Sequence, residues 1–175
     1  IKTLGEDHAA TIKLALWMAQ SISKQKNYLE AETVLRKWLA ISKNALGEDD
    51  ETTIGFANWM AHSLFMQENY VEAEEVYRKW LEISKNALGE KNSKTLSLAS
   101  YYGRSLSMQE NYDDAEVVFT EWLEISKNAL GEDDATTIGF ANWMAYSLVM
   151  QENYVDAETA YHRWLEISKN ALGEK

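Results

Sequence analysis

The chain has 175 residues, a net charge of −11, no cysteine and no proline. Without cysteine it can form no disulfide, thiolate metal site or thiol nucleophile, and the acidic charge argues against a nucleic acid partner. No apolar run approaches the ~18 residues that a membrane span needs, and no signal segment opens the sequence, so we expect no membrane partner and a cytoplasmic location.

A 42-residue sequence recurs four times in the chain. Every copy opens with Leu-Gly-Glu and closes with Ile-Ser-Lys-Asn-Ala, and the second and fourth copies agree at 34 of 42 positions. A fixed period in this range is typical of a repeat array in which each copy stacks on its neighbours. Both ends lie inside the repeat pattern, so we expect a piece of a longer array or an engineered array. The expected division is one domain, 1–175, with repeats at 4–45, 46–87, 88–129 and 130–171 and the start of a further repeat at 172–175.

Each repeat contains two helical patterns joined by a short turn. In repeat two, a pair of aspartates precedes an apolar stripe that predicts a helix from about residue 51 to residue 67. Glu68 and Asn69 predict a tight turn. A second stripe predicts a helix from about residue 70 to residue 88, and Gly89 is expected in the left-handed conformation that ends it.

Repeats one and four follow the same plan, whereas repeat three differs most. Asn92 is its expected helix cap, and Gly103 stands where the other repeats have alanine. A glycine in the middle of a helix costs about 1 kcal/mol relative to alanine, so we expect a close helix–helix contact at Gly103. The fold class predicted for the chain is all-α, with eight antiparallel helices.

Small and aromatic residues recur at fixed places in each helix pair. In repeat two they are Ala61 and Leu64 in the first helix and Asn69, Tyr70, Ala73, Tyr77, Trp80 and Leu81 in the second. This pattern resembles the tetratricopeptide repeat, and the period and the Leu-Gly-Glu-Asp-Asp connector resemble the longer subtype of kinesin light chains. The resemblance implies a right-handed superhelical solenoid of four helix-turn-helix repeats whose first helices line a concave groove.

Two departures from the family pattern occur in all four repeats. Alanine replaces a large residue of the first helix, and tryptophan replaces a small residue of the second helix. We interpret this as a volume exchange between facing core positions, which cores tolerate when the total volume is kept. A further set of first-helix tryptophans, Trp17, Trp59 and Trp143, is expected to wedge between neighbouring repeats.

One face of the first helices varies between repeats. Steps of three and four residues place twenty positions on that face, and none of them is Asp or Glu although the chain has 28 acids. The position that differs in every repeat is occupied by Gln20, His62, Arg104 and Tyr146. We therefore expect a neutral to basic groove inside an acidic shell.

This groove is predicted to bind a protein or peptide partner, as an extended or helical segment that carries acidic groups. Lys13, Lys24 and Arg104 would hold a carboxylate through charge-assisted bonds, and Asn58 and Asn142 would bond the peptide backbone. An apolar side chain would be accepted by Phe65, Met66, Met108 and Met150, and Gln20, His62 and Tyr146 would complete the set.

Other interpretations remain open. Variation on this face can arise by drift between duplicated repeats. The chain can also be a structural array that self-associates end to end into homo-oligomers, or a designed scaffold without a native ligand. We expect no enzyme, cofactor or metal site, because the three histidines lie in different phases of their repeats and no catalytic cluster recurs.

Overall fold

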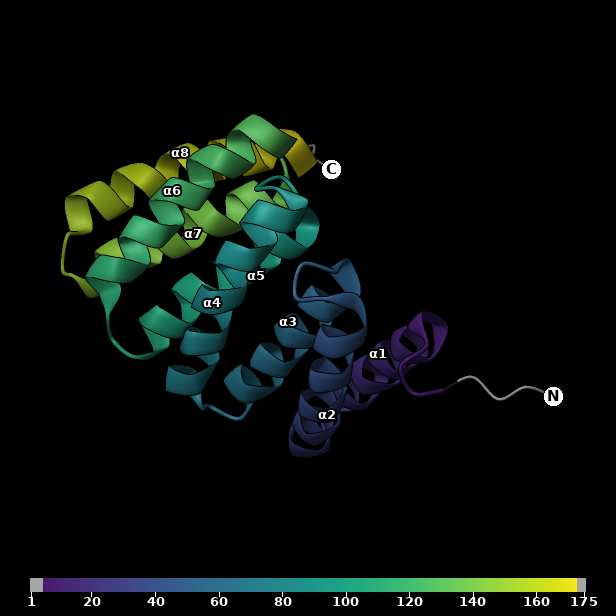
Figure 1. The fold of residues 1–175 in the computed structure, drawn as a ribbon. Helices are drawn as coiled ribbons and strands as arrows, with labels where there is room; N and C mark the ends of the chain where they lie inside the picture. Colours follow the sequence, from purple (N-terminus) through teal and green to yellow (C-terminus); the bar gives the residue numbers. More distant parts are fainter. Residues whose placement is uncertain (1–4, 173–175) are drawn as a thin grey trace. The chain divides into compact units, whose positions relative to one another are not determined.

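The computed structural model of the chain describes residues 5–172, which form eight α-helices and no strand (Figure 1). The predicted all-α class is confirmed. Leu4 and the predicted start of a further repeat beyond Leu172 lie outside the described residues. The helices are α1 (Ala9–Lys24), α2 (Tyr28–Leu46), α3 (Glu51–Met66), α4 (Tyr70–Leu88), α5 (Ser93–Met108), α6 (Tyr112–Leu130), α7 (Ala135–Met150) and α8 (Tyr154–Leu172).

Local signals in the sequence set the helix limits. The Asp50 carboxylate accepts a hydrogen bond from the Thr52 backbone N–H at 2.7 Å at the start of α3, and Asn92 caps α5 in the same way. Gly89 has a φ of +85° after α4, which confirms its predicted role. The turns inside the repeats instead place a non-glycine residue at positive φ, such as Glu68 at +63°.

The contacts group the chain into two compact halves, Ile1–Gly89 and Glu90–Lys175, each holding two repeats. We call them the N-terminal half and the C-terminal half and describe each by itself. The single domain expected over 1–175 stays a prediction.

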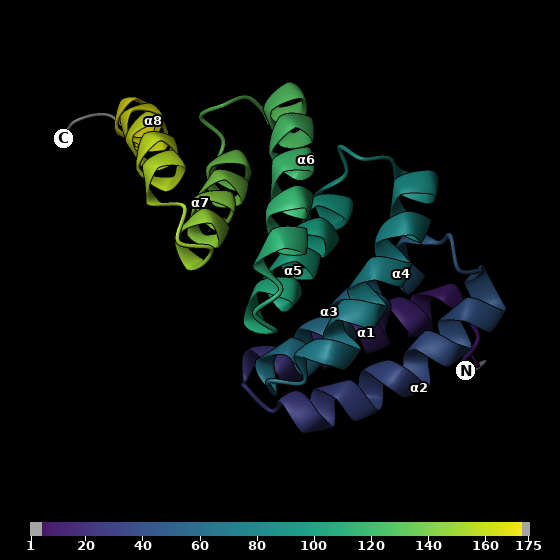
Figure 2. The same cartoon turned by 90° about the vertical axis from the view of Figure 1, so that its left-hand side faces the viewer.

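Within each half, every helix packs against the next one along the chain (Figure 2). The first helices of the two repeats also approach each other, α1 against α3 and α5 against α7, whereas the backbones of the two second helices do not. The first helices therefore form the inner side of each half, as the predicted arrangement requires.

The exchanged alanine and tryptophan positions lie in the core. Ala57 and Ala99 are fully buried, Trp80 is 3% exposed, and Trp122 is buried as well. In the first repeat the corresponding Trp38 is half-buried. Because both positions are buried in successive repeats, the small alanine side chain of the first helix can compensate for the large tryptophan side chain of the second.

The glycine of repeat three marks a close contact between α5 and α6. A Cβ atom placed on Gly103 would lie 2.7 Å from the ring of Phe119, closer than any real Cβ contact. Phe119 is fully buried and its ring stacks on Trp143 at 6.0 Å between centroids, so it has little room to move. The close helix–helix contact expected at this glycine is confirmed.

Two glycine substitutions should have opposite effects on stability. Gly103→Ala is expected to lower the free energy of unfolding by about 1–3 kcal/mol, because the added methyl overpacks against Phe119. Gly139→Ala in α7 meets nothing within 4 Å, so its better helix propensity should raise that free energy by about 0.5–1 kcal/mol. Urea unfolding measures both effects.

A second substitution in Phe119 tests the cause. Repeat one pairs Ala19 with Leu35 at the two positions, so adding Phe119→Leu to Gly103→Ala should give a double variant that loses less than the sum of the single losses. Strict additivity would show that the ring is not the obstacle.

Truncation of a core tryptophan should be costly. Trp80→Ala is expected to lower the free energy of unfolding by about 3–5 kcal/mol, because it leaves a cavity in the core. Trp17→Ala serves as the matched control, since the Trp17 side chain is 52% exposed. A loss below about 1 kcal/mol for Trp80→Ala would contradict the core assignment.

Candidate functional site

The variable position of repeat two lies in an aromatic setting on the inner side of the N-terminal half. The ring of His62 in α3 lies edge-on to Trp59, with 5.4 Å between centroids, and to Tyr28 at the start of α2, with 6.4 Å. One turn further along α3, Phe65 packs edge-to-face against Tyr70 at 5.2 Å. We call Tyr28, Trp59, His62, Phe65 and Tyr70 the N-terminal cluster.

The C-terminal half carries a similar group with a cation at its centre. The guanidinium carbon of Arg104 lies 4.4 Å from the ring centroid of Tyr101 and 5.0 Å from that of Trp143. Tyr146 lies edge-on to Trp143 at 5.4 Å and to Tyr112 at 6.4 Å. We call Tyr101, Arg104, Tyr112, Trp143 and Tyr146 the C-terminal cluster.

This stacking orients the Arg104 side chain. A guanidinium group is attracted to aromatic faces and loses less side-chain freedom on binding when it is already held. Its N–H bonds lie in the plane of the group and can pair with both oxygens of a carboxylate. This chemistry makes Arg104 a candidate for recognising a carboxylate that has an apolar neighbour.

The other predicted residues differ in how much surface they present. Lys13, Lys24, Asn142 and the three methionines are exposed, and Gln20 and Asn58 are half-buried. Phe65 is buried and packs against Tyr70, so it presents little surface of its own; its expected contact with an apolar side chain of the ligand stays a prediction. The exposed methionines are Met66, Met108 and Met150, one on the last turn of each of the helices α3, α5 and α7.

The expectation that first-helix tryptophans wedge between repeats holds for only part of the set. Trp143 of repeat four stacks on Phe119 of repeat three, which confirms the expectation there. It is wrong for Trp17, which is half exposed and has the Lys13 ammonium 5.6 Å from its ring centroid. No second helix of a preceding repeat is present among residues 5–172 to cover Trp17.

Two tyrosines of the C-terminal half, Tyr112 and Tyr161, have a raised phenol pKa. Burial is the main cause that raises the pKa of the Tyr112 phenol, with smaller contributions from Tyr146 and Glu110. Burial likewise raises the pKa of Tyr161 in α8, again with a contribution from Tyr146. Both phenols therefore keep their O–H at neutral pH and can donate hydrogen bonds there.

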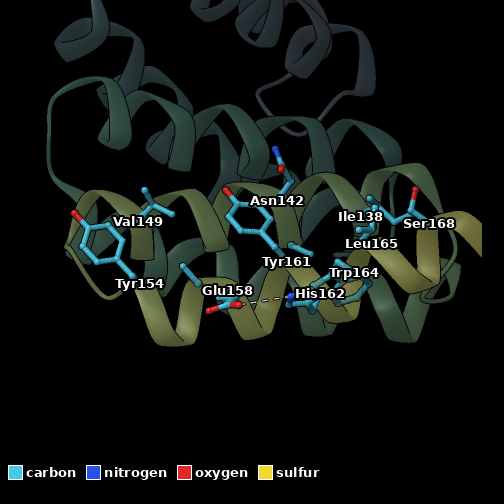
Figure 3. A pocket seen from close by; sticks show the side chains of 12 residues that line it. Ile138, Asn142, Val149, Tyr154, Glu158, Tyr161, His162, Trp164, Leu165 and Ser168 are labelled. Carbon is cyan, nitrogen blue, oxygen red and sulfur yellow. Dashed lines mark ion pairs between the residues drawn. The ribbon is translucent and has the colours of Figure 1, made fainter.

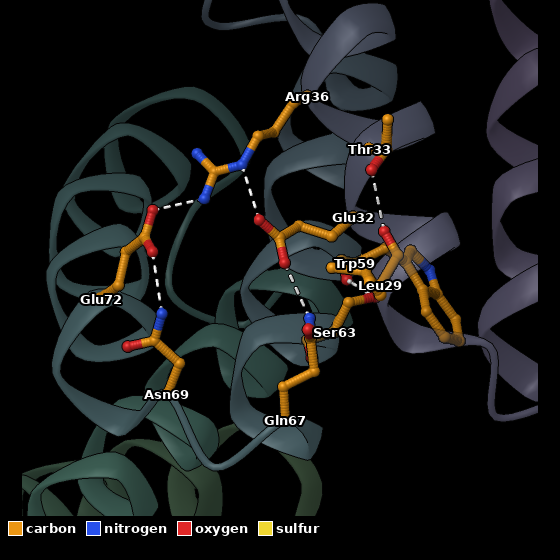
Figure 4. A network of polar contacts seen from close by, with 9 residues as sticks. All are labelled: Leu29, Glu32, Thr33, Arg36, Trp59, Ser63, Gln67, Asn69 and Glu72. Carbon is orange, nitrogen blue, oxygen red and sulfur yellow. Dashed lines mark hydrogen bonds and ion pairs between the residues drawn. The ribbon is translucent and has the colours of Figure 1, made fainter.

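A polar network joins repeats one and two on the side of the second helices (Figure 4). Arg36 donates to Glu32 at 2.8 Å within α2 and also bonds Glu72 of α4. Gln67, at the end of α3, donates to the other oxygen of Glu32 at 2.7 Å. Asn69 donates to Glu72 at 2.9 Å, so α2, α3 and α4 share one network.

The C-terminal half keeps only part of this network. Gln151 donates to Glu116 at 2.9 Å, as the equivalent pair does in the other half. Thr120 stands at the place of Arg36, so the arginine bridge has no counterpart. Pairs of this kind on the surface contribute little to stability singly.

A pocket that sequence reasoning missed lies between α7 and α8. Its volume is about 600 Å³, and its lining is mainly apolar, with Tyr154, Tyr161 and Leu165 among the contributors (Figure 3). Two of its lining residues, Asn142 and Val149, also belong to the variable face. The repeat register could have found the pocket, because equivalent residues of α2 and α6 are buried beneath a following first helix.

Within residues 5–172, no group of three or more His, Asp or Glu side chains could hold a metal ion. No helix in this part of the chain has both the length and the apolar content needed to cross a bilayer.

Comparison with known proteins found a family model that is similar to part of the chain. A sequence model described as "Tetratricopeptide repeat" matches residues 53–128, and repeat four copies repeat two at 34 of 42 positions. No curated protein matches the chain.

Solved structures share the fold at low sequence identity. Two are crystal structures of a putative kinesin light chain from Podosopora anserina with nearly identical TPR-like repeats; both are 14% identical to this chain. Their TM-scores are 0.85 and 0.83, and the matches cover 97% and 98% of this chain and 80% and 82% of theirs. The third is BtubC (BKLC) from P. vanneervenii, 20% identical with a TM-score of 0.79, covering 92% of this chain and 63% of that one.

Proposed function

We propose that this chain, a tetratricopeptide repeat array, is a protein-interaction scaffold that binds an extended peptide segment carrying a carboxylate on the inner face of its first helices. The fold generally mediates protein–protein interaction. The observation that carries the finer proposal is the Arg104 guanidinium held between the rings of Tyr101 and Trp143.

The chemistry around Arg104 supports an acidic ligand with apolar neighbours. Tyr112 and Tyr146 add phenol groups to the same cluster, and a phenol can donate a hydrogen bond to an acidic ligand. Met108 offers an exposed, adaptable apolar contact on the helix of Arg104. The Asn142 amide is exposed on α7 and can bond a peptide backbone.

Charge favours the same ligand over others. The chain as a whole carries −11, yet the twenty positions of the variable face include no acid. An acidic peptide would meet this face, while repulsion from the rest of the surface would discourage binding elsewhere.

The N-terminal cluster offers a second contact of different character. His62 takes the place of Arg104, and Lys24 and Met66 take the two places at the helix ends. A peptide that lies across repeats one and two would meet a neutral aromatic surface with a lysine at its edge. Each half therefore selects different side chains with the same backbone geometry.

The remaining parts of the hypothesis follow from the sequence. We expect a cytoplasmic protein that is not an enzyme, needs no cofactor and binds neither nucleic acid nor membrane. The alternatives are a self-associating structural array and a designed scaffold without a native ligand. Self-association has a separate observation in its favour, the pocket between α7 and α8, which is developed below.

Two substitutions separate the contribution of the Arg104 charge from that of its stacking and paired hydrogen bonds. Arg104→Gln removes the cation and should weaken binding of an acidic peptide at least about tenfold, because a charged hydrogen bond is worth roughly 1.5–3 kcal/mol. Arg104→Lys keeps the charge but cannot bond in two places or stack in the same way, so it should recover only part of the affinity. Fluorescence anisotropy with a labelled peptide measures the affinities.

Two controls accompany this series. Thermal melts of all variants should show whether the loss of stacking alters the fold, and salt titration should weaken the wild-type complex more than the Gln variant. Full affinity in Arg104→Gln would contradict the assignment of Arg104 as the carboxylate site.

The ligand itself can be found by peptide display. The library is selected on the wild-type chain and counter-selected on a variant with His62→Ala, Arg104→Glu and Tyr146→Ala. We expect an enriched acidic consensus that the variant no longer binds. A consensus that the variant retains, or none at all, would turn the weight of evidence toward the two alternatives.

A further inference from the structure

The pocket between α7 and α8 has an apolar lining of the kind against which a helix packs. Tyr154, Tyr161, Trp164 and Leu165 of α8 line it together with Ile138 of α7, and the rim includes the ion pair between His162 and Glu158 at 3.7 Å (Figure 3). Its volume of about 600 Å³ lies within the range of pockets that bind ligands or side chains.

Comparison of equivalent repeat positions indicates which kind of element packs against such a surface. Leu165 of α8 is 52% exposed, whereas its counterpart Leu123 of α6, a helix that packs against α7, is 5% exposed. Tyr161 is likewise exposed, whereas its counterpart Phe119 is fully buried. The pocket therefore corresponds to the place that a first helix occupies against the preceding second helix.

The first helix of the chain exposes the complementary surface. Leu14 of α1 is 61% exposed, whereas its counterpart Phe56 of α3, which packs against α2, is fully buried. Trp17 and Met18 are also exposed, although Met60, the counterpart of Met18, is buried. These residues, Leu14, Trp17 and Met18, form an apolar patch of the size of one helix face, which we call the α1 patch.

Polar groups on the two surfaces match as well. Inside the N-terminal half, the hydroxyls of Ser42 in α2 and Thr53 in α3 form a buried hydrogen bond of 2.5 Å. Ser168 of α8 and Thr11 of α1 are the residues at these two repeat positions. A first helix in the pocket would bring these two hydroxyls close together, as in the N-terminal half. In the C-terminal half the equivalent Ser126 hydroxyl donates to a backbone carbonyl of α6 instead, so this hydroxyl pair is not a feature of every contact between repeats.

Charged groups repeat the correspondence. Lys43 of α2 pairs with Glu48 of the following connector at 2.5 Å, and Lys169 and Glu6 occupy the same two repeat positions. The Gln67–Glu32 hydrogen bond between repeats has its counterpart in Gln25 and Glu158. Both surfaces thus carry the apolar, hydroxyl and charged groups of the contact that joins one repeat to the next.

We infer that the pocket between α7 and α8 binds the α1 patch of a second copy of this chain, head to tail. Each surface lies within one half of the molecule, so the contact does not depend on how the two halves are arranged. The interface is heterologous, because each molecule contributes a different surface to it. For residues 5–172, every assembly keeps one unfilled pocket and one unfilled α1 patch, so association continues to longer chains unless the rotation closes a ring. This inference is independent of peptide binding by Arg104.

The test is the dependence of molar mass on concentration. Light scattering or sedimentation velocity of the wild-type chain should show mass rising above that of the monomer as concentration increases. Salt should promote the association, since it screens the repulsion between molecules of charge −11 while leaving the apolar contact intact. Wild-type chain that stays monomeric at all concentrations would overturn the inference and leave the pocket to a partner of other chemistry.

Point variants locate the interface. Leu165→Glu in the pocket and Leu14→Glu in the α1 patch should each raise the dissociation constant at least about tenfold, because each buries a charge without a partner. Val155→Glu on α8 and Leu29→Glu on α2 are matched controls at exposed apolar side chains that line neither surface. Controls that weaken association as much as the two test variants would show a non-specific apolar contact and overturn the inference.

Mixing the two test variants gives the decisive result. The Leu165→Glu chain keeps an intact α1 patch, and the Leu14→Glu chain keeps an intact pocket. Each alone should be monomeric, and an equal mixture should form a one-to-one dimer of twice the monomer mass that grows no further. A dimer that forms only in the mixture requires the intact α1 patch of one variant and the intact pocket of the other, which no other pairing of surfaces requires. A mixture that stays monomeric would therefore exclude the head-to-tail contact.

Discussion

The packing of each first helix onto the second helix of the preceding repeat is the interaction on which the structure depends. In the N-terminal half it brings Leu39 of α2 under α3 and joins Ser42 to Thr53 through a buried hydroxyl pair. The apolar part of this contact supplies the stability, since a helix pair of this size cannot bury its apolar face alone. The hydroxyl pair adds a requirement of register, because a shift along the helix would leave two polar groups buried without partners.

This requirement separates the residues that must be kept from those that can change. The alanine and tryptophan core positions recur in every repeat, and where repeat three departs from the pattern it does so in a compensated pair, with Gly103 making room for Phe119. The inner face carries no such constraint. His62, Arg104 and Tyr146 sit at one geometric position between aromatic neighbours, yet they offer an imidazole, a guanidinium and a phenol. A fixed scaffold with one variable position per repeat is the physical basis of the proposed binding surface, which differs from one half to the other.

Much of the fold could be predicted from the sequence because the signals are local. Helix α3 ends within one residue of its predicted limit and α4 matches it, since an aspartate cap, a turn at Glu68 and a glycine at residue 89 act over a few bonds. The candidate site was less accessible. Spacing alone places Arg104 on the inner face, but its stacking against Trp143 joins two repeats and depends on side-chain conformation that no periodicity encodes. The exposure of Trp17 was missed for a different reason, because the repeat pattern describes an interior copy and α1 has no preceding neighbour among the described residues.

The contact between a second helix and the following first helix stabilises the interior. The same two apolar surfaces, where no neighbouring helix covers them, favour association with another molecule. Leu14 and Leu165 stand at repeat positions whose counterparts in other repeats are buried, but both are exposed here and remain apolar. The acidic net charge opposes association, but it acts over a distance that salt shortens, whereas the apolar contact acts only on touching and is not screened. Repulsion therefore sets how often two molecules meet, and complementarity of the two surfaces sets whether they stay together. An array of near-identical repeats can therefore tune its assembly in two ways: net charge changes the repulsion between molecules, and a substitution in one of the two surfaces changes the fit between them.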